Sequence, residues 1–197
     1  MNFAQYLSEK SIDLNMDFSE YIVEESEEPD VLKNLSRRET KRIIKAKEKE
    51  DKPKSSVNAK EAKRLLTEAI LQRTADLLSA SDKISCCAKL SNLLVLNHGK
   101  APSAIGNGIA IPHVRSLQSR DLIMSFGICR HGVDFDAPDQ EKVYIFIGMT
   151  APNYNDALYL KIYKSIASAL LRTDVKEQLM SAKEEGEIIR IFNKYFI

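Results

Sequence analysis

The sequence predicts an α/β fold, a three-layer sandwich in which helices cover both faces of a mixed central sheet. Two nearly continuous apolar runs, residues 122–128 and 143–149, have the pattern of strands that are covered on both faces. Segments with helical periodicity precede and follow these runs, and interleaved strands and helices favour a layered α/β architecture. A strongly charged stretch near the N-terminus departs from both patterns and is interpreted as an insertion.

Composition narrows the class of protein. A chain of 197 residues can bury a sizeable core, and contents of 44% hydrophobic and 29% charged residues are ordinary for a globular protein. A net charge of +1 gives no general attraction to nucleic acid or membranes, and no apolar run approaches the ~20 residues of a membrane span. Three cysteines, an odd number without zinc-ligand spacing, indicate reduced thiols. We therefore expect a cytoplasmic protein with no metal, no nucleic-acid partner and no membrane insertion.

The first 57 residues divide into two parts. Residues 1–16 are predicted to form a short helix and a strand, because apolar residues alternate at positions 12, 14 and 16. In residues 17–57 the charges segregate: seven acids and no lysine or arginine occupy 17–30, whereas ten bases and four acids occupy 33–54. A capping-box pattern predicts a solvated helix over about 37–50. Two interpretations stay open, a mobile self-neutralising segment or a docking element for a protein partner.

Helices account for most of the remaining chain. Apolar residues that recur every three or four positions predict helices over about 58–78, 84–96, 156–171, 174–182 and 185–195. Asn58 is placed to cap the first of these helices. Between the two strand candidates, residues 131–136 are predicted to form a turn that contains His131.

The most informative stretch is the loop and short strand that end at His113. Gly106 and Gly108 permit backbone angles and close approaches that suit a loop whose amide groups face a ligand. Pro112 fixes its own φ, so we expect His113 to be displayed at the end of a stiff extended segment. A neutral imidazole is nucleophilic and responds to small changes in its environment.

The run Gly-Asn-Gly-Ile-Ala-Ile-Pro-His, residues 106–113, resembles the phosphorylation-site signature of the enzyme IIA proteins of the bacterial sugar phosphotransferase system. The similar class is the mannitol/fructose class, which includes the nitrogen-regulatory IIA proteins. The resemblance covers residues 1–16 and 58–197, which we predict to form one domain, and leaves 17–57 as an insertion that the family usually lacks. It implies that Nε2 or Nδ1 of His113 accepts a phosphoryl group from a small phosphocarrier protein. The covalent phosphohistidine is then the carrier, so no cofactor is implied.

A phosphoryl group on His113 needs hydrogen-bond donors around its oxygens. The family usually supplies an arginine and a second histidine, but this chain has Asn97-His98 and Tyr159 at those places. Arg115 could restore the missing positive charge and is preferred to His98, because a guanidinium never loses its proton. The predicted site therefore has His113 as catalytic residue, and its supporting residues are Gly106, Asn107, Gly108, Ser103, Arg115, Asn97, His98 and Tyr159.

Two functional hypotheses follow. In the first, the chain is a phosphoryl carrier, and a regulatory role of the nitrogen type is favoured over sugar uptake because no transporter domain is attached. In the second, it is a degenerate IIA-like module that acts by docking to a regulatory protein target without efficient phosphotransfer. The intact signature that ends at His113 favours the first hypothesis, and the altered residues at positions 97 and 159 favour the second.

Overall fold

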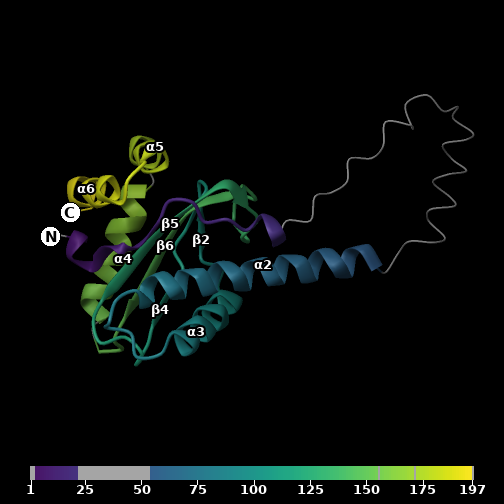
Figure 1. Ribbon diagram of the computed structural model, residues 1–197, viewed down its shortest axis with the longest axis horizontal. Coiled ribbons are helices and arrows are strands. Elements are labelled where there is room, and N and C mark those ends of the chain that lie inside the picture. Colours follow the sequence, from purple (N-terminus) through teal and green to yellow (C-terminus); the bar gives the residue numbers. More distant parts are fainter. Residues whose placement is uncertain (1–2, 22–53, 155, 171, 197) are drawn as a thin grey trace, which may run out of the picture. The chain divides into compact units, whose positions relative to one another are not determined.

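The computed structural model describes residues 3–21, 54–154, 156–170 and 172–196 (Figure 1). The chain divides into two compact units, one of residues 1–17 and 68–197 and the other of residues 18–67. The helix predicted for 37–50 and most of the predicted insertion lie outside the described residues. The larger unit contains all six strands of the sheet.

Within the described residues, six strands form one mixed sheet in the order β1-β5-β6-β3-β2, with β4 also paired to β6. The strands are β1 (Leu7–Asp13), β2 (Ala104–Gly106), β3 (Ile109–Ala110), β4 (His113–Arg115), β5 (Ile123–Val133) and β6 (Val143–Ala151). The two apolar runs form β5 and β6, which pair antiparallel at the centre. β1 is parallel to β5, β3 and β4 are parallel to β6, and β2 is antiparallel to β3. The predicted mixed sheet is confirmed.

β3 and β4 are two parts of one line of chain along β6. Ile109 pairs with Ile145 and His113 pairs with Met149, so the register along β6 is the same on both sides of the break. Pro112 lies in the break because it has no N–H to donate, but its carbonyl accepts a 2.9 Å hydrogen bond from the amide of Met149. This line carries His113 towards the C-terminal end of β6.

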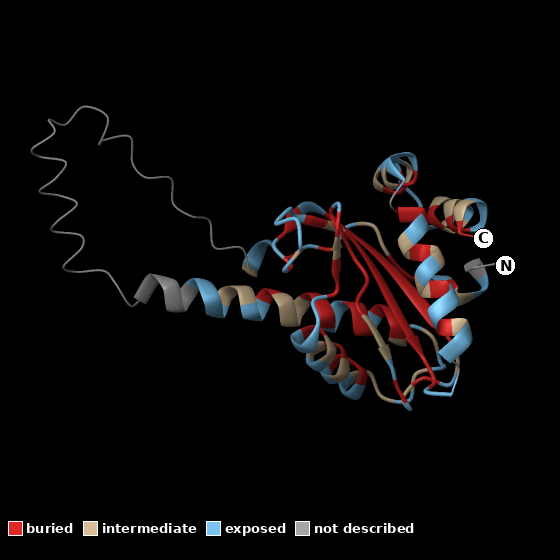
Figure 2. Ribbon diagram, turned by 180° about the vertical axis from the view of Figure 1, so that it is seen from behind, coloured by how far each residue is buried: buried red, intermediate tan, exposed pale blue. Residues whose placement is uncertain are grey.

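Helices cover both faces of the sheet (Figures 1 and 2). In the larger unit they are α3 (Cys87–Lys100), α4 (Asp156–Leu170), α5 (Thr173–Ser181), α6 (Glu185–Tyr195) and the part of α2 (Lys54–Ser79) from residue 68 on, with the short 3₁₀ turn η1 (Phe3–Tyr6). The 3₁₀ turn η2 (Ser19–Tyr21) belongs to the smaller unit. On β6, Ile147 and its alternate neighbours share one core with α4, α5 and α6. On the opposite face, a methyl group at Gly148 would lie 2.5 Å from Cγ2 of Thr74, so α2 packs directly on the strand backbone there. The layered arrangement that the sequence predicts is therefore present.

The N-terminal strand differs from its prediction. β1 ends at Asp13 and contains Ile12, whereas residues 14 and 16 follow the strand. The strand begins earlier because Ser11 can be buried inside it: the Ser11 hydroxyl donates to the carbonyl of Ser8 at 2.7 Å and accepts from the Ser8 amide at 3.0 Å. A polar residue that satisfies its own hydrogen bonds hides the alternation on which the prediction relied.

Three further boundaries also differ. His131 lies in β5, with its side chain exposed, because the strand continues to Val133 through an irregular register after Ile128. A bulge of this kind keeps a strand paired beyond the point where its apolar pattern stops. α2 begins at Lys54, so Asn58 lies inside the helix rather than capping it. α3 spans Cys87–Lys100, shifted by a few residues from the predicted helix over 84–96.

Candidate active site

His113 opens into a surface depression of ≈ 470 Å³. The residues that line it are Asn97, His113, Val114, Arg115, Asn153 and Tyr159. They come from the last turns of α3, from β4, from the loop after β6 and from the first turns of α4. Residues from four separate segments of the chain therefore meet where the line of β3 and β4 ends.

The imidazole of His113 is held in one tautomer. Its Nδ1 lies 2.7 Å from the carbonyl oxygen of Ile111, and the ring is half-buried. A backbone carbonyl only accepts hydrogen bonds, so Nδ1 must carry the proton. In the neutral imidazole the lone pair is then on Nε2. The geometry thus distinguishes the two nitrogens that the sequence left equivalent.

Asn97 holds the backbone that carries this ring. Its side-chain amide Nδ2 donates a 2.8 Å hydrogen bond to the carbonyl of His113. Asn97 also lines the depression, so the same side chain joins the end of α3 to β4 and presents polar atoms to the space beside the imidazole. Asn97 therefore makes a positioning contact within the site.

Arg115 and Tyr159 form the other side of the depression. The guanidinium of Arg115 lies 5.8 Å from the centroid of the Tyr159 ring and pairs with the carboxylate of Asp156 in the first turn of α4. The side chains of the ion pair are 45% and 62% exposed, and exposed pairs of this kind contribute little energy. Arg115 is therefore a cation that can turn towards an anion bound beside His113.

Two tyrosines of α4 face the imidazole. The ring centroid of Tyr159 lies 6.2 Å from that of His113, and the centroid of Tyr163 lies 4.8 Å from it. Burial raises the pKa of the Tyr159 hydroxyl, although the charge of Arg115 opposes the shift, and burial also raises the pKa of Tyr163. Both phenols are therefore protonated near neutral pH, and Tyr159 can donate one hydrogen bond but cannot supply positive charge.

The Gly-Asn-Gly turn does not lie at this site, contrary to the sequence prediction. Residues 106–108 connect β2 to β3 and have φ of 89°, 55° and 73°, in the region that glycine favours. The amide of Asn107 donates to Asp139 at 2.6 Å, and Lys176 donates to the Asn107 carbonyl at 2.6 Å. Gly108 and His113 are five positions apart in an extended part of the chain, which corresponds to about 16 Å. Gly106 and Gly108 allow the chain to form this turn, which Asp139 and Lys176 hold, and neither glycine lines the depression.

His98 and Ser103 are also directed away from the depression. Both are buried, the Ser103 hydroxyl lies 3.1 Å from Nδ1 of His98, and the His98 ring packs 4.5 Å from that of Phe135. Consecutive residues of an α-helix point about 100° apart, so Asn97 faces the site while His98 faces the interior. The pair fastens the end of α3 to the segment before β2 and does not support His113.

Sequence reasoning missed two residues that surround the site. Tyr163 follows Tyr159 by four residues, a spacing that places both on one face of a predicted helix, so this signal was available. Asp156 begins the same helix, but its pairing with Arg115 joins residues 41 positions apart and left no trace in the sequence pattern.

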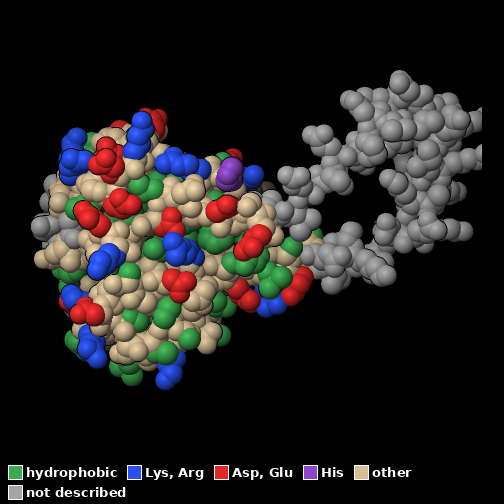
Figure 3. Space-filling model, in the orientation of Figure 1, with side chains coloured by type: hydrophobic (Ala, Val, Ile, Leu, Met, Phe, Trp, Pro, Cys, Tyr) green, Lys and Arg blue, Asp and Glu red, His purple; other side chains and the backbone are tan. Residues whose placement is uncertain are grey.

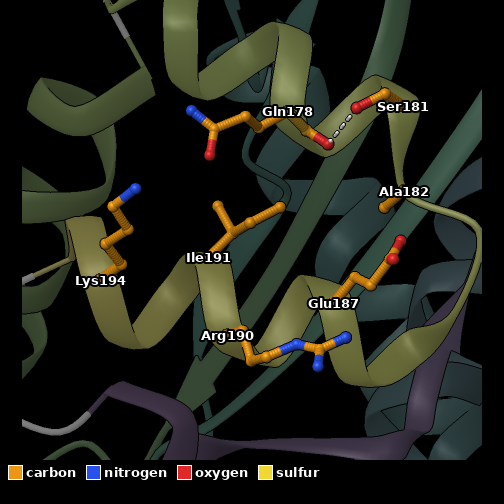
Figure 4. Close-up of a pocket in the computed structure, with 7 residues that line it drawn as sticks. All are labelled: Gln178, Ser181, Ala182, Glu187, Arg190, Ile191 and Lys194. Carbon is orange, nitrogen blue, oxygen red and sulfur yellow. Dashed lines mark hydrogen bonds between the residues drawn. The ribbon is translucent and has the colours of Figure 1, made fainter.

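Another cavity, of ≈ 400 Å³, lies between α5 and α6. The side chains drawn in Figure 4 include Gln178, Glu187, Arg190 and Lys194, so charges of both signs face it and no histidine or cysteine is among them. Figure 3 shows Lys/Arg and Asp/Glu side chains intermingled over the visible face rather than collected in patches of one sign. This cavity offers no nucleophile comparable to His113.

Two searches of the described residues gave negative results. No group of three or more histidine, cysteine or carboxylate side chains is arranged to bind a metal ion in that part of the chain. None of the helices seen there combines the length and apolar character needed to cross a membrane.

The model of the family described as "Phosphoenolpyruvate-dependent sugar phosphotransferase system, EIIA 2" matches residues 54–195. The chain is 32% identical over 98 residues to the nitrogen regulatory protein of Pseudomonas aeruginosa, covering 50% of this chain and 64% of that protein. It is 23% identical over 128 residues to the fructose-specific EIIABC component of Bacillus subtilis, covering 65% of this chain and 20% of that protein. The chain thus spans less than two thirds of the length of these relatives.

Solved structures share the fold. The nitrogen regulatory protein IIA-Ntr of Neisseria meningitidis superimposes with a TM-score of 0.68 at 18% identity, covering 97% of this chain and 99% of that chain. IIA mannitol of Escherichia coli superimposes with a TM-score of 0.54 at 18% identity, covering 63% of this chain and 86% of that chain.

Proposed function

Since the chain belongs to the EIIA 2 family of the phosphoenolpyruvate-dependent sugar phosphotransferase system, we propose that it carries a phosphoryl group on Nε2 of His113. The observation that supports this most directly is the 2.7 Å hydrogen bond from Nδ1 of His113 to the Ile111 carbonyl. It leaves the lone pair on Nε2 of a ring that lines an open, polar depression. A ring held in one tautomer needs no proton rearrangement before it attacks phosphorus.

The transfer step uses few protein groups. The Nε2 lone pair forms the N–P bond as the bond from phosphorus to the donor breaks, and the donor atom keeps that electron pair. The proton stays on Nδ1, so the phosphorylated ring is positively charged. Arg115 and the donors of Asn97 and Tyr159 are placed to meet the phosphoryl oxygens, and positioning with charge neutralisation supplies the rate.

The surroundings of the depression favour a protein as phosphoryl donor. In the described part of the chain, five large hydrophobic side chains are exposed, and four of them lie within two residues, along the chain, of a residue that lines the depression. They are Leu96, Leu117, Tyr154 and Leu160, and their exposed fractions range from 53% to 81%. Exposed apolar side chains near the site in sequence favour contact with a protein surface over binding of a small phosphorylated metabolite. We assign the donor role to a small phosphocarrier protein.

A regulatory role is the finer part of the proposal. It is supported by the similarity to nitrogen regulatory proteins of Pseudomonas aeruginosa and Haemophilus influenzae, at 32% and 30% identity. The cytoplasmic location and the division into residues 1–16 with 58–197 and an insertion at 17–57 stay predictions.

The second candidate is a docking module that transfers phosphate poorly. It is favoured by the absence of a guanidinium at Asn97 and by the neutral phenol of Tyr159, because the cation nearest to His113 in the described site, Arg115, is shared with Asp156. Exposed apolar side chains near the site would serve docking equally in a phosphoryl carrier and in a docking module. Only a measurement of phosphotransfer therefore separates the two candidates.

Incubation with phosphoenolpyruvate, the general phosphotransferase enzyme and the phosphocarrier protein tests the proposal. Intact mass spectrometry should show a gain of about 80 Da for the native chain and for a His131→Ala control, whose exposed histidine lies on β5. His113→Ala should show no gain. A folded native protein that gains no mass would support the docking module instead.

A further inference from the structure

We propose that Tyr163 is a positioning residue that fixes the orientation of the His113 ring and stabilises the positive charge which that ring acquires on phosphorylation. The second half of this inference rests on the proposed function, because the charge appears only when Nε2 carries a phosphoryl group. The first half concerns the unphosphorylated protein and can be tested separately.

Tyr163 contacts the imidazole from a side that the phosphoryl group does not use. Its ring centroid lies 4.8 Å from that of His113 at an interplanar angle of 53°, closer than the 6.2 Å of Tyr159. Tyr159 lines the depression but Tyr163 does not. Tyr163 therefore touches the ring itself rather than the space in which phosphorus would sit.

The hydrogen bond to Ile111 alone does not fix the ring. A single Nδ1–H···O contact leaves the imidazole able to rotate about its side-chain bonds. Such a rotation would lengthen the contact that selects the tautomer and would move Nε2 out of line with an incoming phosphorus. The ring of Tyr163 opposes this motion because α4 is anchored to the sheet by its fully buried neighbours Ile162 and Ile166. Two contacts, one polar and one aromatic, thus define one ring position.

The same aromatic ring suits the charge of the product. When Nδ1 keeps its proton and Nε2 carries phosphorus, the imidazole becomes a cation. A cation within about 6 Å of an aromatic ring is stabilised by the electrons of that ring, and desolvation strengthens the effect. Tyr163 is half-buried, and burial raises the pKa of its hydroxyl, so it meets the cation as a neutral ring.

Core packing by itself does not explain a tyrosine here. The apolar contacts of α4 with the sheet are made chiefly by fully buried side chains such as Ile162, Ile166 and Leu170, whereas Tyr163 is only partly buried. Tyr163 packs against the edge of this core, a contact that an aliphatic side chain could also make. An aliphatic residue could not reproduce the contact between the aromatic ring of Tyr163 and the imidazole of His113.

The test compares Tyr163→Leu and Tyr163→Met, which remove the aromatic ring, with Tyr163→Phe, which removes only the hydroxyl. Tyr144→Leu makes the same change at a partly buried tyrosine of β6 that does not line the depression. The first measurement is the ¹⁵N spectrum of the His113 imidazole in the unphosphorylated variants. The second is the half-life of the phosphohistidine after the donor proteins are removed.

In the native protein and in the Phe and Tyr144 variants, we expect protonated Nδ1 and unprotonated Nε2 signals and half-lives within about twofold of each other. The Leu and Met variants should show averaged nitrogen signals and half-lives about three- to tenfold shorter. Native signals and half-lives in folded Leu and Met variants would overturn the proposal. If native protein cannot be phosphorylated, the proposed function fails, while the nitrogen spectra still decide whether Tyr163 positions the ring.

Discussion

Arg115 provides the most direct test of how the site would neutralise the charge of a phosphoryl group on His113. Arg115→Ala removes the guanidinium that lines the depression beside His113. A hydrogen bond to a charged group contributes about 1.5–3 kcal/mol, so the rate of phosphoryl transfer should fall by about 10- to 150-fold. Arg115→Lys should recover only part of the rate, because an ammonium group cannot make a bidentate contact.

The partner of Arg115 gives a prediction of opposite sign. Asp156 competes with the phosphoryl group for the guanidinium, but an exposed pair contributes at most about 1 kcal/mol. Asp156→Asn should therefore raise the transfer rate, by no more than about fivefold. If Arg115 acts on phosphate, the two substitutions must shift the rate in opposite directions.

The assay follows transfer from the phosphorylated phosphocarrier protein by rapid quench and intact mass. Arg172→Ala is the matched control, because Arg172 forms a comparably exposed pair with Asp174 beside α5, away from the residues that line the depression. The control should transfer at the native rate. An unchanged rate for Arg115→Ala would refute the reasoning, since the cation would then have no part in the transition state.

Three other predictions concern packing at Gly148, the hydrogen bond of Asn97 and the pH dependence of stability at Asp139. Gly148→Ala should lower the free energy of unfolding in urea by about 1–3 kcal/mol, because the added methyl would lie 2.3 Å from a hydroxyl oxygen of β5. Gly99→Ala, in an open helical position, should not be destabilising. Asn97→Ala removes the hydrogen bond to the His113 carbonyl and should slow phosphorylation severalfold without unfolding the chain; a native rate would make that contact dispensable. The amide of the β2–β3 turn lowers the pKa of Asp139, so its contribution to stability is present above the unfolded pKa of about 3.9 and is lost as pH falls through the lower folded pKa. Acid unfolding of Asp139→Asn should accordingly show a smaller loss of stability over that range, and parallel curves for variant and native protein would contradict it.

The contacts of Asn97 and Tyr159 explain how the residues around His113 are held together. Asn97 and Tyr159, which the sequence analysis identified as departures from the expected family pattern, both line the depression at His113. Asn97 supports the backbone of β4, and Tyr159 forms a surface over which Arg115 lies. The depression at His113 is polar, and its cation is Arg115 of β4, since the lining residue that α3 contributes, Asn97, is neutral.

The sequence by itself determined the architecture and the presentation of His113. Continuous apolar runs can be buried only as central strands, so β5 and β6 and the helix that follows them were predictable from residues 122–171. Pro112 ends the pairing of β3 and starts a new short strand at His113, which is a local property of the chain. The family signature also depends on contiguous residues and needed no structure.

Only the tertiary structure decided which residues surround His113. The Gly-Asn-Gly turn is near it in sequence but about 16 Å away, because an extended chain advances about 3.3 Å per residue. Asn97 reaches the site and His98 does not, because a helix turns its neighbours about 100° apart and packing selects the face. Tyr163 is 50 positions away along the chain, yet its ring touches the imidazole because α4 crosses the sheet there. Contacts between distant segments depend on how the helices pack on the sheet, and the sequence does not display that packing.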